Sequence, residues 1–313
     1  MRVVQVPDSL DGRTFEDLVD ALGHVEDERA LFDARHLRWI DPVGMTGLLA
    51  AGVAAAERTG VQPRLEIPES SEVRSYLARM AFFARAAPVF ILDGDQPSRS
   101  GGASDVLLEV TSISRNSDVH EVVDRVQERA GAILAESLAY PPTAVVQFSV
   151  ILSEVCQNIV EHADASGWVA AQTYNWTKRL GRNVVVISVV DMGRGFRGSL
   201  APEHASRFGD RWGDATALEA AFIHGITRFP DSGRGQGIQQ IRKQVRRWDG
   251  MISIRSGTAR IADVPDWYDL PPLEEGLAPL GGAQISIVLP ARAEDGSGSG
   301  GGSAAQPAAA GGF

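Results

Sequence analysis

Short apolar runs alternate with amphipathic segments through the first 93 residues, a pattern typical of an α/β domain. The predicted strands are Arg2–Val6, Ala30–Asp33 and Pro63–Ile67. The predicted helices are Gly12–Leu22, a segment from Asp41 to about Gly60, and Ser70–Met80 as the last. Asp41 is a natural N-cap for the second helix, because Pro42 then occupies the first helical position.

The second half of the chain has fewer helices and more strands. The predicted strands are Val106–Val110, Trp168–Tyr174, Asn183–Val190, Met251–Arg255 and Gln284–Leu289. The predicted helices are Asp118–Leu138, Thr143–His162 and Gln236–Trp248, and a long glycine-bearing loop precedes the last of them. Helices segregated in this way favour a layer of helices on one face of a mixed sheet.

Two segments interrupt these patterns because they contain too few apolar residues to build a core. Residues 94–104 are rich in Gly, Pro and Ser and predict a flexible linker. Residues 293–313 are nearly all Gly, Ser, Ala, Pro and Gln and predict a disordered tail. We therefore expect two α/β domains, at residues 1–93 and 105–292.

The charge and composition of the chain argue against some classes of function. The 313-residue chain has a net charge of −10, which argues against bulk binding to nucleic acid. It has neither a charged-then-apolar leader nor an apolar run long enough to span a membrane, so we expect a cytoplasmic protein without a membrane partner. The single cysteine, Cys156, lies in an apolar helical stretch and predicts a buried, inert thiol.

The first candidate site element is a pair of side chains four residues apart. Glu154 and Asn158 would project from the same face of a predicted helix. An amide oxygen suits a magnesium ion that keeps most of its water, and a nearby carboxylate could deprotonate an attacking group. Taken alone, the pair is more typical of a solvated polar stripe on an amphipathic helix.

The second element is an acidic glycine turn after the apolar run Val184–Val190. Asp191 ends this run and is followed by Gly193 and Gly195. A carboxylate at a strand end can accept a hydrogen bond from an exocyclic amine of a base, and glycines allow the backbone to approach it closely. An ordinary turn would have the same composition.

The third element is a glycine-rich loop that leads into a helix. Its residues are Gly233, Arg234, Gly235, Gln236, Gly237 and Ile238. Backbone N–H groups at a helix start point toward anions, and the helix dipole favours negative charge there. The loop has neither the P-loop lysine nor the preceding strand of a dinucleotide-binding fingerprint.

The order of the three elements in residues 105–292 resembles the GHKL ATPase superfamily, with its Bergerat fold. The resemblance implies that Glu154 is the general base, that Asn158 is the magnesium ligand and that Asp191 reads adenine. It also implies ATP and Mg²⁺ as cofactors, phosphate binding by the 233–238 loop and a mobile lid over Arg197–Ser232. Gly281-Gly282-Ala283-Gln284 resembles the closing box of the family, and the sequence after Asn158 is most similar to anti-sigma serine kinases.

The first domain resembles STAS domains of the anti-sigma factor antagonist type, through its strand–turn–helix pattern with Asp41 and Gly44. Phosphorylatable members carry serine between these two positions, where this chain has Pro42 and Val43. Thr46 could substitute, although a threonine within a helix is typically structural. The resemblance therefore favours a docking or sensing module over a phosphoacceptor.

These resemblances imply a regulatory protein that binds Mg-ATP and controls a protein partner, either a sigma factor or a separate STAS-domain protein. Serine phosphorylation by this chain would make it an enzyme of the kinase type. The alternatives are a nucleotide-gated binding module with negligible catalysis, and an ATPase that acts through nucleotide-dependent homodimerisation.

Overall fold

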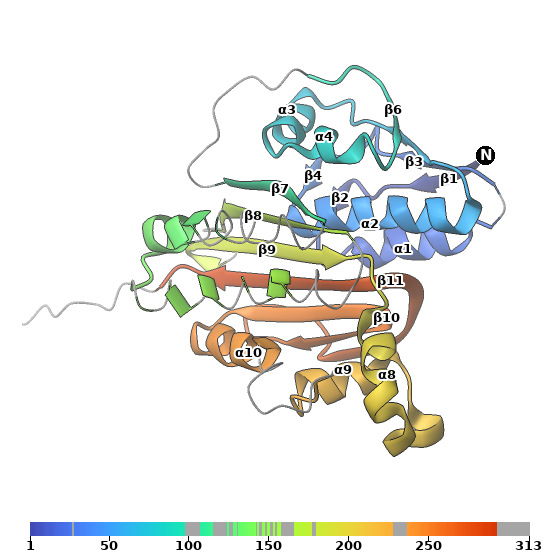
Figure 1. Ribbon diagram of the computed structural model, residues 1–313. Helices are drawn as coiled ribbons and strands as arrows, with labels where there is room; N and C mark the ends of the chain where they lie inside the picture. Colours follow the sequence, from blue (N-terminus) through green and yellow to red (C-terminus); the bar gives the residue numbers. More distant parts are fainter. Residues whose placement is uncertain are drawn as a thin grey trace, which may run out of the picture.

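The computed structural model describes residues 1–26, 28–97, 107–114, 131–141, 166–176, 180–227 and 237–292, together with 124, 128–129, 143, 146–147, 149–150, 153 and 155–157. It is an α/β structure with a two-part organisation (Figure 1). The amino-terminal part runs from β1 to β6, and the carboxy-terminal part from β7 to β11. About half of the residues of the predicted helices Asp118–Leu138 and Thr143–His162 lie outside the described residues, as do the whole segments 98–104 and 293–313.

The amino-terminal part contains a parallel sheet in the order β1-β3-β5-β6 and a separate pair, β2-β4. Its strands are β1 (Arg2–Gln5), β2 (Ser9–Leu10), β3 (Ala30–Asp33), β4 (Trp39–Ile40), β5 (Arg64–Glu66) and β6 (Ile91–Asp93). Its helices are α1 (Phe15–Gly23), α2 (Pro42–Thr59), α3 (Ser71–Arg79) and α4 (Phe82–Ala86). Parallel strands joined through helices account for the alternating pattern of the sequence.

The predicted capping of α2 is confirmed. The Asp41 carboxylate accepts the Gly44 N–H at 2.9 Å, and Gly60 ends the helix in the left-handed region at φ +68°. The prediction that the helix from Ser70 is the last of this part is wrong, because α4 and β6 follow it. Ala81, at φ +56°, separates α3 from α4, and a five-residue helix is too short to show a helical period.

The carboxy-terminal sheet is entirely antiparallel among the described strands, so the prediction of a mixed sheet is wrong. Its order is β10-β11-β9-β8-β7. The bounds are β7 (Leu107–Ile113), β8 (Gly167–Asn175), β9 (Asn183–Asp191), β10 (Met251–Asp263) and β11 (Leu273–Pro290). Short connections join β8 to β9 and β10 to β11, and such connections pair strands antiparallel.

The predicted loop after β9 contains helices instead. They are α8 (Gly195–Phe208), the short 3₁₀ turn η2 (Gly209–Arg211) and α9 (Asp214–Phe222), and α10 (Gly237–Arg247) comes next. Leu218 and Phe222 of α9 are fully buried against the sheet. The part of the expected lid that is described is therefore helical, and α9 belongs to the core. A short π-helical segment, η1 (Ile133–Ser137), also packs on the sheet, through Leu134.

Both faces of the antiparallel sheet are covered (Figure 1). Val185, Ile187 and Val189 of β9 share one core with α9 and α10, whereas Val190, on the opposite face, packs in the core of the amino-terminal part. Helices α1 and α2 lie against this second face. A strand buried on both faces is apolar on both, and between Val184 and Val190 only Ser188 is polar.

Candidate functional site

The acidic turn forms at the end of β9, on the face of the sheet that carries α9 and α10. Asp191 follows Val189 by two residues, so its side chain projects from that face. Its Oδ1 accepts the Gly193 N–H at 2.8 Å. Burial raises the pKa of the Asp191 carboxyl to about 6, although hydrogen bonds from the Gly193 and Ala283 amides oppose the shift. The Asp191 carboxyl is thus half-buried and only partly shielded from water.

Two glycines make this turn possible. Gly282 has φ +74°, and a Cβ on it would overlap the carbonyl oxygen of Asp191. Gly195 has φ +64°, and its Cβ would lie 2.6 Å from Ser256 Oγ. Gly195 begins α8 just after β9, and Gly282 lies in the neighbouring strand β11, where Ala283 pairs with Asp191. At Gly195 and Gly282, the backbone around Asp191 is therefore packed too closely for any residue that carries a side chain.

A serine that the sequence did not single out holds the turn together. Ser256 Oγ donates to the Gly282 carbonyl at 2.9 Å and accepts the Phe196 N–H at 3.1 Å. It thereby joins β10, β11 and the start of α8 beside the Asp191 turn. A lone serine within a strand has no distinguishing local pattern, so only the paired strands reveal this role.

The predicted phosphate loop is described only at its end. Gly237 is buried at the start of α10, and Ile238 packs partly against the sheet core. Gly233, Arg234, Gly235 and Gln236 lie outside the described residues, as do Glu154 and Asn158. The structure therefore describes Asp191, Gly193, Gly195, Gly237 and Ile238 of the predicted set.

Two other predictions can be examined. Cys156 is fully buried, and burial raises the pKa of its thiol to about 12, which confirms the prediction of a buried thiol and fits low reactivity. Thr46 is also fully buried, and its Oγ1 donates to the Pro42 carbonyl at 3.0 Å, which confirms a structural position.

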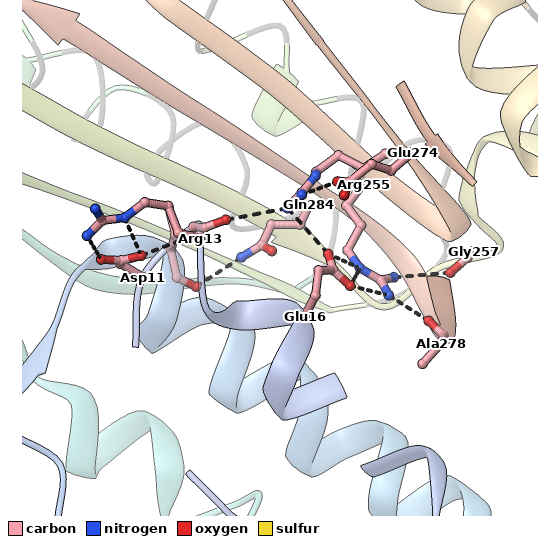
Figure 2. Close-up of polar contacts among 11 residues, drawn as sticks. Asp11, Arg13, Glu16, Arg255, Gly257, Glu274, Ala278 and Gln284 are labelled. Carbon is pink, nitrogen blue, oxygen red and sulfur yellow. Dashed lines mark hydrogen bonds and ion pairs between the residues drawn. The ribbon is translucent and has the colours of Figure 1, made fainter. Parts of the chain in front are cut away.

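Sequence reasoning missed the polar contacts that join the two parts (Figure 2). The Arg255 guanidinium is 4% exposed and binds both carboxylate oxygens of Glu16, at 3.0 to 3.2 Å. Gln284 donates to the Val43 carbonyl at 3.0 Å, and Thr46 shares a 2.7 Å hydrogen bond with Ser188. These partners are far apart in the sequence, so no local pattern links them.

Comparison with known proteins adds no assignment: no protein-family model matches the chain, and no curated protein matches its sequence. Within the described ranges, no helix is both long enough and apolar enough to cross a membrane.

Proposed function

We propose that the carboxy-terminal part binds Mg-ATP in a GHKL-type site and that the protein uses this binding to control a protein partner. The observation that carries the proposal is the half-buried Asp191 carboxylate, with its raised pKa, in a turn where Gly195 and Gly282 leave no space for a Cβ atom. A partly desolvated acceptor beside closely packed backbone suits the amine edge of a flat adenine ring.

The described residues fit the expected cofactor in two further respects. Asp191 shares its sheet face with α10, and Gly237 begins that eleven-residue helix, whose first N–H groups suit phosphate. By resemblance, Asn158 would hold the magnesium ion and Glu154 would act as the base. The nucleotide supplies a transferable phosphoryl group, and these chain residues bind and orient it.

The amino-terminal part supports a STAS-type docking or sensing module in the same proposal. Asp41 caps α2, and Gly44 lies so close to the Leu10 carbonyl that a Cβ would overlap it. Thr46 is fully buried, so its hydroxyl is closed to a kinase. The partner that is controlled would therefore be a separate protein, a sigma factor or another STAS-domain protein.

A second candidate is a nucleotide-gated module with negligible catalysis. The contact between the two parts favours it, because Arg255 binds Glu16 and the adjacent Ser256 holds the Asp191 turn. A shift of the Asp191 turn on nucleotide binding would reach the amino-terminal part through Ser256 and Arg255, which are neighbours in β10. The coupling would then be a population shift between two arrangements of this contact.

Calorimetric titration of the full chain with Mg-ATP tests the binding claim, with GTP as the competing base. We expect selectivity for ATP that is lost in Asp191→Asn, since the amide replaces one acceptor oxygen by a donor. Binding without base selectivity, or unchanged binding by the variant, would overturn the assignment. Glu154→Ala then separates the two candidates. A kinase with this change would lose phosphotransfer but still bind ATP, whereas a nucleotide-gated module would still control its partner.

A further inference from the structure

A cavity of about 370 Å³ lies between the two parts of the protein. Its walls come from the β2–α1 turn and β4 on one side and from β9, β10 and β11 on the other. The lining residues of β9 include Val186, and those of β11 include Ser286, on the sheet face that turns away from Asp191. The cavity is thus separate from the proposed nucleotide site, and its volume lies within the range of small-ligand sites.

One side of the cavity is aromatic. Trp39, Tyr174, Trp176 and Tyr268 all line it. The Trp39 and Tyr174 rings are 5.1 Å apart at 56°, and Trp39 remains 44% exposed. An exposed tryptophan beside a cavity offers an apolar face on which a planar ring can stack. The sheet contributes polar groups opposite, among them Gln284 and the facing pair Ser253 and Ser286.

Arg260 brings an unsatisfied donor to the cavity. Its side chain is only 9% exposed and forms ion pairs with Glu274 and, at 3.6 Å, with Glu16. Its Nη1 also donates to the Gly12 carbonyl at 3.4 Å. Its Nε has no hydrogen-bond partner in the described part of the chain. A buried N–H without an acceptor is costly, so an acceptor oxygen on a ligand would be favoured there.

Asp41 brings a buried carboxyl group to the same cavity. It is 8% exposed, and its Oδ1 accepts the Gly44 N–H as the cap of α2. No cation lies within ion-pair distance of it among the residues that the structure describes. Burial raises the pKa of this carboxyl to about 7, and the nearby Asp11 adds to the shift. A positive group on a ligand would compensate the charge of Asp41 where the protein does not.

The remaining charges of the cavity are already paired (Figure 2). Arg13 binds Asp11 at 2.7 Å, and Arg255 binds Glu16. Arg260 is paired as well, but its Nε–H lacks an acceptor among the described residues, so this N–H and the Asp41 carboxyl are the two groups of the cavity with capacity left for a ligand. They differ in sign, and Gly12, whose carbonyl binds Arg260, directly follows Asp11 in the turn that also lines the cavity.

We propose that this cavity binds a small zwitterionic molecule with a planar ring, of which an aromatic amino acid is the simplest example. Its carboxylate accepts the Nε hydrogen of Arg260, its ammonium group pairs with Asp41, and its ring stacks on the Trp39 side. The ligand contacts both parts of the protein, so its binding stabilises their contact by mass action. This site does not depend on nucleotide binding.

Three probes that share a phenylethyl unit test the proposal by calorimetry on the full chain. L-phenylalanine carries both charged groups, 2-phenylethylamine only the amine, and 3-phenylpropionate only the carboxylate. We expect L-phenylalanine to bind about tenfold or more tightly than either half, since each charge-assisted hydrogen bond contributes about that factor. Absence of binding by all three, or equal binding, would overturn the proposal.

Two variants test which residue of the cavity binds each charged group of the ligand. Asp41→Asn keeps a good helix cap and should abolish the preference for L-phenylalanine over 3-phenylpropionate. Arg260→Lys keeps the positive charge but removes Nε, and should abolish the preference over 2-phenylethylamine. Glu57→Gln, at an exposed position of α2, is the control that retains both preferences. Retention of both preferences in the two site variants would place the ligand elsewhere.

Discussion

Replacement of Gly282 by alanine tests whether the Asp191 turn requires close backbone contact. Its φ of +74° lies in the left-handed region, which costs an alanine about 1–2 kcal/mol. The new Cβ would overlap the Asp191 carbonyl oxygen and lie 2.7 Å from its carbonyl carbon and 3.0 Å from Met192 Cα. Carbon atoms normally approach to about 3.5 Å, so strand β11 must move by roughly half an ångström or more. Forced packing of this kind adds about 1–3 kcal/mol.

The expected total is a loss of about 2–5 kcal/mol in the free energy of unfolding, measured by urea denaturation. The same movement displaces Asp191, so ATP affinity should fall as well. Gly281→Ala is the matched control, because its Cβ would meet no atom within 4 Å, and its stability should change by less than about 0.5 kcal/mol. Equal stability of the two variants would refute the reasoning.

Three further variants probe the contact between the parts and the acidic turn. Glu16→Gln leaves the Arg255 guanidinium, which is 4% exposed, without its carboxylate, and should lower the free energy of unfolding by about 3 kcal/mol in urea denaturation. Glu274→Gln, at a more exposed ion pair, should lower it by less than about 1 kcal/mol. Equal losses in the two variants would contradict this reasoning. Thr46→Val removes the hydroxyl that shares a hydrogen bond with Ser188 and should lower the free energy of unfolding by about 1–3 kcal/mol. The control Thr59→Val should lower it by about 0.5 kcal/mol or less. An effect at Thr46 no larger than that at Thr59 would argue against the buried contact. The Asp191 pKa rises from 3.8 to about 6 on folding, so the folded state binds the proton more tightly than the unfolded state does. As pH rises from about 4 to above 6, the free energy of unfolding of the nucleotide-free wild type should fall by about 3 kcal/mol relative to Asp191→Asn. Parallel curves of stability against pH would contradict this.

Elements with strong local signals were predictable from the sequence. Helix α2 has a side-chain cap at one end and a left-handed glycine at the other, so its bounds follow from Asp41 and Gly60. Strand β3 coincides with its prediction because it is short and wholly buried. The acidic turn was also predictable, since Asp191 and Gly193 come at the end of Val184–Val190, a run in which only Ser188 is polar.

The covering of the second sheet face was not predicted, for a physical reason. On β10 and β11, residues such as Ser253, Arg255 and Gln284 alternate with apolar ones, which is the usual pattern of a face turned to water. Here the polar stripe is buried, because Glu16, Val43 and Thr46 of the amino-terminal part satisfy it. The run Val184–Val190, in which only Ser188 is polar, was the available sign of two-sided burial.

The most direct test of the central claim is hydrogen–deuterium exchange of the full chain, followed by mass spectrometry, with and without Mg-ATP. The account predicts slowed exchange in peptides that cover residues 191–196 and the start of α10, with little change in β1 and β3. Slowed exchange confined to the amino-terminal part, or no change anywhere at saturating ATP, would contradict a nucleotide site at the Asp191 turn.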